Sequence, residues 1–168
     1  RKTTPPAFAR LLESARAICP EMAITTDVIV GFPGETEAEF EESLAFVQQM
    51  NFAGGHVFSY STREGTAAAR MKGQVHGSVI RQRNGRMREV LLQSSLAYRR
   101  RFMGSIARVL WESCDVVGEK GWRLHGLSDN YIRVEAYSAT ALWNQISRVR
   151  LGQITDEGMR GVILDMGE

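Results

Sequence analysis

The chain has 168 residues, of which 43% are hydrophobic and 24% are charged, and its net charge is +2. This composition is typical of a globular protein rather than a disordered one, and no apolar run approaches the roughly 20 residues of a membrane span. Two cysteines exclude a disulfide framework and cannot hold a metal by themselves, so we expect a reducing, cytoplasmic location. The chain begins at Arg1 without an initiator methionine, and we interpret it as a fragment of a larger protein.

The first part of the sequence predicts alternating helices and strands. A helix should begin after Thr4, because Pro5 and Pro6 favour a first helical turn, and it should end before Pro20. Residues 23–30 are β-branched and almost continuously hydrophobic. They therefore predict a strand that is covered on both faces.

A turn over residues 31–35 and a second helix should follow. Thr36 and Glu39 have the spacing of a capping box, and apolar residues then recur at helical spacing as far as Met50. A second strand is predicted near residues 56–60. The order strand, helix, strand predicts a parallel βαβ unit.

The rest of the chain predicts a loop, a long helix and a small barrel. Residues 61–77 show no sustained period, and a basic helix should then run from a cap at Ser78 to Gly104. From residue 105 onward, five short alternating segments predict a small antiparallel β-barrel. We therefore expect two domains, residues 1–103 and residues 104–168. The apolar side of the basic helix is formed by Met87, Leu91, Tyr98 and Phe102.

Charge is unevenly distributed along the chain. Residues 20–50 hold seven carboxylates and no lysine or arginine, whereas residues 78–103 hold seven arginines and no lysine. The planar guanidinium group of arginine can form two parallel hydrogen bonds either to a phosphate or to a carboxylate. The arginine-rich helix therefore predicts a phosphate-binding surface, a solvated helix face, or a face that pairs with an acidic surface elsewhere.

Two groups of polar residues lie where the predicted parallel strands end. Asp27 lies inside an apolar strand, which is costly unless its carboxylate is paired or faces a site. Ligands of parallel sheets bind at the carboxyl ends of the strands, so Asp27 and the turn after it are candidates, with a satisfied core aspartate as the alternative. His56, at the second strand, is expected to be packed rather than catalytic, and Tyr60, Ser61 and Arg63 follow it.

The barrel segment contains candidates for nucleic-acid contacts. Tyr131 and Arg133 are followed by Arg148 and Arg150, which alternate along one strand and should share a face. Aromatic and cationic side chains on a small barrel can stack on bases and contact phosphates. Residues 104–168 hold nine acidic and seven basic residues, so any binding face should be local.

Several segments resemble radical-SAM methylthiotransferases. Residues 25–36, TTDVIVGFPGET, resemble the TDxIVGFPGET signature of this family, and residues 56–71 resemble its HVFxYSxRxGTxAAxM segment. The opening RKTT is similar to the end of the family's M-x-R-x-[YT] segment. Residues 104–168 resemble the TRAM domain, and GLSDNY at residues 126–131 is similar to the GYTDNY of the subgroup that modifies N6-threonylcarbamoyladenosine in tRNA.

The resemblance implies a fold and a reaction. The fold would be α/β, the C-terminal part of a partial (β/α) radical-SAM barrel followed by a small all-β TRAM barrel. The full-length enzyme would add a methylthio group to C2 of N6-threonylcarbamoyladenosine beside the tRNA anticodon. The alternatives are isopentenyladenosine in tRNA, a ribosomal protein, or a non-catalytic RNA-binding module.

The resemblance also implies cofactors and partners. These are S-adenosylmethionine, two [4Fe–4S] clusters, an electron donor that reduces a cluster, and the tRNA anticodon stem-loop. Neither cysteine set that holds the clusters is present, so we expect this fragment alone to be inactive and Cys19 and Cys114 to be buried thiols.

The resemblance assigns roles to individual residues. Arg1 would pair with the cofactor carboxylate, Asp27 would accept hydrogen bonds from the cofactor, and Phe58 would lie near its adenine. Our own candidates for tRNA contacts, chosen for their charge and stacking chemistry, are the arginine-rich helix and four barrel residues, which are Tyr131, Arg133, Arg148 and Arg150.

Overall fold

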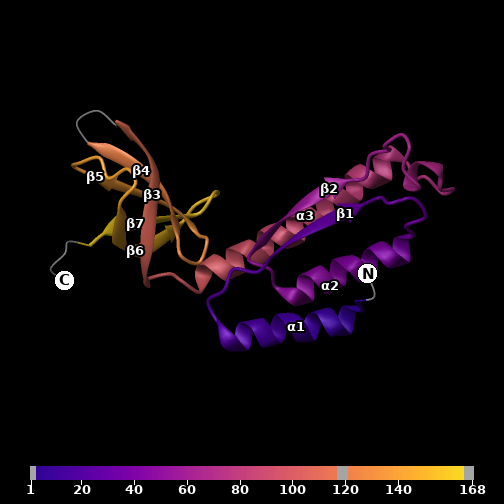
Figure 1. Cartoon of the computed structure of the whole chain (residues 1–168), viewed down its shortest axis with the longest axis horizontal. Helices are drawn as coiled ribbons and strands as arrows, with labels where there is room; N and C mark the ends of the chain where they lie inside the picture. The colour runs from indigo at the N-terminus through magenta and orange to yellow at the C-terminus, as the bar shows by residue number, and fades with distance from the viewer. Residues whose placement is uncertain (1–2, 117–120, 165–168) are drawn as a thin grey trace. The chain divides into compact units, whose positions relative to one another are not determined.

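The computed structural model describes residues 3–116 and 121–164. The chain divides into two compact units, Arg1–Ala97 and Tyr98–Glu168, and each is described by itself. The first unit contains two strands and three helices, with a short 3-10 turn before the last helix (Figure 1). These elements are α1 (Pro5–Ile18), β1 (Thr25–Val30), α2 (Glu37–Met50), β2 (Gly54–Ser59), the turn at Ala68–Arg70, and α3 (Gly77–Arg100).

The predicted βαβ unit is confirmed. β1 and β2 pair in parallel, in a register that runs from Thr25 opposite Gly54 to Val30 opposite Ser59. The capping box at the start of α2 is also present, because the Thr36 hydroxyl accepts from the Glu39 amide at 3.2 Å while the Glu39 carboxylate accepts from the Thr36 amide at 2.8 Å. Both orphan amides of the first turn are thereby satisfied.

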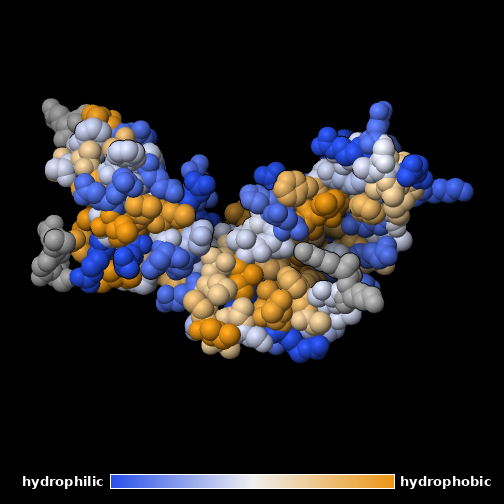
Figure 2. Space-filling view, viewed as in Figure 1, coloured by the Kyte–Doolittle hydropathy of each residue, from blue (hydrophilic) through white to orange (hydrophobic). Residues whose placement is uncertain are grey.

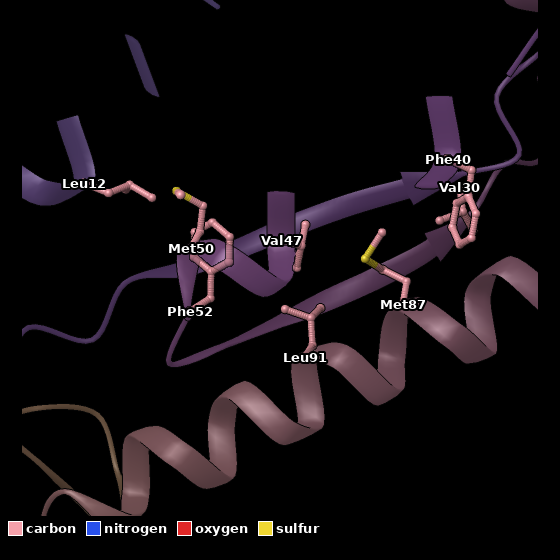
Figure 3. Packing of buried hydrophobic residues seen from close by; sticks show 8 residues of the cluster. All are labelled: Leu12, Val30, Phe40, Val47, Met50, Phe52, Met87 and Leu91. Carbon is pink, nitrogen blue, oxygen red and sulfur yellow. The ribbon is translucent and has the colours of Figure 1, made fainter. Parts of the chain in front are cut away.

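All three helices contribute to one hydrophobic core on one side of the two strands. Figure 3 shows Leu12 of α1 beside Met50 of α2, and Val47 of α2 with Met87 and Leu91 of α3 in the same cluster. Val30 points into this core from β1. Because the helices cover the same face, burial alternates along β1, and the prediction of a strand covered on both faces is wrong for the described residues.

The start of α3 differs from the prediction by two residues and by its cap. The helix begins at Gly77, so Ser78 is already helical. The ring Nδ1 of His76 accepts from the Ser78 amide at 3.3 Å and lies 2.7 Å from the Ser78 hydroxyl. His76 therefore supplies the acceptor that we had expected from Ser78.

The second unit is a closed five-stranded barrel with the strand order β3-β4-β5-β7-β6. The small barrel is confirmed, but one of its pairs is parallel, with Val134 opposite Met159. Five strands cannot close with antiparallel neighbours throughout, because an odd number of alternating directions leaves one parallel pair. The strands are β3 (Ile106–Val116), β4 (Trp122–Ser128), β5 (Arg133–Ser138), β6 (Ile146–Ile154) and β7 (Met159–Ile163).

The barrel encloses a tightly buried core and receives the end of α3. Trp111 is fully buried, and its indole Nε1 donates to the Ser147 hydroxyl at 2.9 Å. The Tyr98 hydroxyl donates to the Asn130 carbonyl at 3.1 Å. Arg99 donates to the carbonyls of Thr155 and Gly158, and burial lowers the pKa of its guanidinium, which the charge of Asp156 opposes. No helix in the part of the chain that the structure describes has the length and apolar content of a membrane span.

Candidate active site and nucleic-acid interface

The side of β1 and β2 that faces away from the helices is open to solvent. Asp27, Ile29, His56 and Phe58 are among the side chains on this side, which we call the strand face. Asp27 is in register with His56, and Ile29 with Phe58, so the four lie in two adjacent rows. Ile29 is 57% exposed and Phe58 is 51% exposed. A carboxylate beside exposed apolar and aromatic side chains suits a ligand that has both a polar and a flat apolar part.

The strand face brings together two of the three residues assigned to the cofactor. Asp27 and Phe58 share the face, whereas Arg1 lies outside the described residues. His56 is exposed, with its ring centroid 6.2 Å from that of Phe58, so the expectation of a packed histidine is wrong. Ile29 was missed, although strand alternation from Asp27 would have placed it on the same face.

The turn after β1 is fixed by a buried arginine of α3. The Glu35 carboxylate accepts from the Gly31 amide at 2.7 Å and from Arg83 Nη1 at 2.7 Å. Arg83 also donates to the Glu35 carbonyl at 3.0 Å. A further bond runs from the Gly34 amide to the Gly73 carbonyl at 2.8 Å and ties the turn to the loop after β2. The turn is therefore held from two sides.

The acidic and basic runs of the sequence partly neutralise each other. Arg83, which is 4% exposed, also pairs with Glu37 at 2.8 Å, and Arg86 pairs with Glu37 and Glu41. Burial would lower the pKa of Arg83, but hydrogen bonds to Glu37 and Glu35 and their charges raise it above its ordinary value. For these two arginines the structure supports pairing with an acidic surface, one of the three predicted alternatives.

The strands β3 and β6 form a basic wall on the outside of the barrel, which we call the β6 wall. Arg148 and Arg150 are both exposed, as predicted from their alternation, and Val149 between them is buried. Arg108 lies directly opposite Arg148, and Ile106 opposite Arg150. Arg108 was not predicted from the sequence, because only the register of the two strands, and no local motif, places it beside Arg148.

Tyr131 and Arg133 lie elsewhere on the barrel surface. Tyr131 is 74% exposed in the turn between β4 and β5, where its φ is 60°. Arg133 lies on β5, which pairs with β4 and β7 and not with β6. It borders a surface cavity of about 350 Å³ together with Glu135, Asp156 and Glu157. Arg133 therefore has acidic neighbours and does not join the β6 wall.

The described residues do not fit an iron–sulfur cluster. Among them there is no group of three or more histidine, cysteine, aspartate or glutamate side chains placed to hold a metal ion. Cys19 is exposed and Cys114 is half-buried, so the expectation that both are buried thiols is wrong. They also belong to different units. Residues of this chain fit S-adenosylmethionine better, since the strand face offers a carboxylate and an aromatic ring.

The chain consists of an α/β unit with an open strand face and a small barrel with a basic wall. Its sequence is similar to those of known tRNA-modifying enzymes. No family model matches the chain. It is 35% identical to threonylcarbamoyladenosine tRNA methylthiotransferase MtaB of Thermotoga maritima over 161 residues, which are 96% of this chain and 36% of that protein. The MtaB of Bacillus subtilis is 35% identical over 90% of this chain and 34% of its own length.

A second type of relative matches over the same extent. The tRNA-2-methylthio-N(6)-dimethylallyladenosine synthase of Maricaulis maris is 34% identical over 161 residues, which are 96% of this chain and 35% of that protein. The chain belongs to the methylthiotransferase family. It spans about a third of the length of these relatives.

Proposed function

We propose that this chain works as part of a tRNA methylthiotransferase that uses S-adenosylmethionine and iron–sulfur chemistry. The supporting observation is the match over 96% of the chain to a curated tRNA methylthiotransferase, together with an open strand face that carries the family signature. Within the enzyme, residues 1–103 would form a wall of the catalytic pocket and residues 104–168 an RNA-binding barrel. The clusters would be held by residues outside this chain.

The strand face is the proposed S-adenosylmethionine contact. Asp27 would accept hydrogen bonds from the cofactor, and Phe58 would lie against its adenine ring. The exposed Ile29 widens the apolar surface beside Phe58. S-adenosylmethionine would supply the reactive carbon chemistry and the methyl group, while these residues bind and orient it. Arg1 stays a proposed partner of the cofactor carboxylate.

The barrel is the proposed RNA contact. Arg148 and Arg150 present two guanidinium groups on one wall, and Arg108 adds a third opposite Arg148. Guanidinium groups bind phosphate oxygens bidentately. Tyr131 offers an exposed ring for stacking, and Arg133 would contact a phosphate from a different side of the barrel. The partner would be the tRNA anticodon stem-loop.

The proposed substrate is N6-threonylcarbamoyladenosine. Its support is the match to two MtaB relatives over at least 90% of the chain and the GLSDNY run at residues 126–131. Dimethylallyladenosine, also called isopentenyladenosine, is a second candidate, because the Maricaulis maris relative named tRNA-2-methylthio-N(6)-dimethylallyladenosine synthase is 34% identical over 96% of this chain. No observation on the described residues favours a ribosomal protein substrate or a non-catalytic module.

Mass spectrometry of tRNA nucleosides from a strain that lacks the gene tests this proposal. We expect loss of the 2-methylthio derivative of N6-threonylcarbamoyladenosine and accumulation of the unmodified nucleoside. Loss of the methylthio derivative of dimethylallyladenosine would instead support the second candidate. An unchanged content of both methylthio nucleosides would contradict the proposed function.

A further inference from the structure

The segment that joins β2 to α3, together with the beginning of α3, carries a concentration of exposed cations. Residues 61–81 contain four of them, against the single carboxylate of Glu64. All four are exposed, and none forms a salt bridge with another residue that the structure describes. We call this group the basic rim. Its members are Arg63, Arg70, Lys72 and Arg81.

The segment between β2 and α3, which carries three of the four rim residues, is held by hydrogen bonds of its own. The Thr66 hydroxyl donates to the Arg63 carbonyl at 2.8 Å. The side-chain amide of Gln74 donates to the carbonyls of Ala68 and Met71 at 3.3 and 3.1 Å. These bonds fold residues 63–74, which include Arg63, Arg70 and Lys72, into one compact segment. Figure 1 shows this segment as a tight coil between β2 and α3, and Figure 2 shows hydrophilic side chains gathered at that end of the unit.

The rim lies at the carboxyl edge of the two strands. β2 ends at Ser59 and leads directly into the segment, while the Gly34 amide of the turn after β1 bonds to the Gly73 carbonyl. Both strands that form the strand face therefore end against the rim. In parallel sheets this edge is where ligands enter.

The rim differs from the arginines that follow it in α3. Arg83 and Arg86 form salt bridges with Glu35, Glu37 and Glu41, so carboxylates already balance most of their positive charge. The rim cations have no such balance among the described residues, and a polyanion would bind them with release of its counterions. Charge complementarity thus favours the rim over Arg83 and Arg86 as a surface for phosphate in the first unit.

We propose that the basic rim binds the RNA phosphates that flank the target nucleotide. This inference rests on the proposed function, because an enzyme that modifies a base takes the base out of its stack into a pocket. The phosphates on either side then lie at the mouth of the pocket. Contacts to them position the RNA and carry no sequence information. The β6 wall would hold a different part of the same RNA.

The test is the salt dependence of RNA binding by the complete gene product that contains this chain. The probe is a fluorescent tRNA anticodon stem-loop that carries N6-threonylcarbamoyladenosine. The variant R70Q/K72Q removes two rim charges, and R10Q removes one exposed charge from α1, outside the rim and the arginine-rich helix, as a control. R70K/K72R keeps both rim charges.

For R70Q/K72Q we expect the slope of log affinity against log salt to fall by about two units, one for each lost contact. The affinity advantage of the wild type over this variant should shrink about tenfold between 50 and 200 mM salt. R10Q and R70K/K72R should keep the wild-type slope. An unchanged slope for R70Q/K72Q, or a decrease of about one unit for R10Q, would overturn the proposal.

The same preparations separate this inference from the proposed function. If the wild type forms a methylthio nucleoside on tRNA but R70Q/K72Q keeps its slope, the rim proposal alone is wrong. If the wild type forms no methylthio nucleoside, the proposed function is wrong, whatever the slopes are.

Discussion

Arg83 and Glu35 lie 48 residues apart in the sequence, and the guanidinium Nη1 of Arg83 donates to the Glu35 carboxylate at 2.7 Å. The same carboxylate oxygen accepts from the Gly31 amide at 2.7 Å. The buried guanidinium of Arg83 therefore fixes the turn after β1. It does so through the Glu35 carboxylate, which also accepts from a backbone amide of that turn. Breaking a buried pair leaves the other charge without a partner, which is more costly than losing an exposed pair.

Replacement of Arg83 by Met should destabilise the chain by about 3 kcal/mol, because the variant leaves the half-buried Glu35 carboxylate without its cation. The matched control is Arg86→Met, which removes a more exposed arginine from the same helix and should have a much smaller effect. Urea unfolding of the 168-residue chain measures both. Equal losses for the two variants would show that Arg83 has no special role in the turn.

Replacement of Gly31 by Ala should be more harmful than replacement of Gly34 by Ala. Both glycines have a positive φ, 75° and 88°, so each alanine costs about 1–2 kcal/mol of backbone strain. A Cβ at Gly31 would also collide with the Ile80 side chain, whereas a Cβ at Gly34 meets open space. The free energy of unfolding should show an extra loss of about 1–3 kcal/mol for Gly31→Ala.

A second substitution checks the cause of that extra loss. Ile80→Ala should be less harmful in the Gly31→Ala background than in the wild type, because it removes the colliding side chain. Additive effects of the two substitutions would mean that the collision does not determine the cost.

The stability of α2 should depend on pH through Glu39. A hydrogen bond from the Thr36 amide, with a further one from its hydroxyl, lowers the pKa of Glu39 below its ordinary value of 4.5. Because the pKa of Glu39 is lower in the folded state than in the unfolded state, the ionised Glu39 stabilises the folded chain fully above about pH 4.5. This stabilisation is lost as the pH falls through the pKa of Glu39 in the folded state. Glu39→Gln keeps an acceptor for the cap but cannot titrate.

Unfolding of wild type and Glu39→Gln should therefore be compared at pH 7 and pH 3. We expect the wild type to lose more stability on acidification than the variant. Glu42→Gln, an exposed carboxylate of the same helix, is the control and should follow the wild type. A wild-type response that Glu39→Gln reproduces in full would exclude the capping box as its source.

Local features of the fold could be predicted from the sequence, and features set by tertiary contacts could not. The cap at Thr36 and the alternation of Arg148 with Arg150 depend on neighbours within four residues, so their patterns are visible in the chain. The exposure of Asp27 depends on which side of the strands the helices cover. The sequence pattern of residues 23–30 does not reveal that all three helices pack on the same side of the strands.

In the candidate site, too, some residues could be predicted from the sequence and others depended on tertiary contacts. Asp27 was a candidate because a carboxylate inside an apolar strand is costly unless it is paired or faces a site, whereas Phe58 came from the resemblance. The register of β1 and β2 places both on one face. Arg108 escaped notice because its relation to Arg148 arises only when β3 pairs with β6. The pairing of Arg83 with Glu35 was one of three open alternatives, since a run of arginines does not specify its partner.

The β6 wall makes a prediction about RNA binding. Arg148→Gln and Arg150→Gln should each lower the salt slope of tRNA binding by about one unit, and the double variant by about two, because each side chain would contact one phosphate. The complete gene product and the stem-loop probe serve here as well. Arg133→Gln tests the other side of the barrel separately. Unchanged slopes for Arg148→Gln and Arg150→Gln would remove this wall from the RNA-binding surface.

The central claim is that the strand face of this chain holds S-adenosylmethionine for a methylthio transfer to tRNA. Its most direct test incubates the complete gene product with undermodified tRNA, a reductant and S-adenosylmethionine that carries an isotopically labelled methyl group. Mass spectrometry of the digested tRNA should find the labelled methyl group in a 2-methylthio-adenosine derivative. Asp27→Ala should require more cofactor for half-maximal labelling, and Glu42→Gln should not. No labelled methylthio nucleoside from the wild type, or an unchanged cofactor requirement in Asp27→Ala, would contradict the claim.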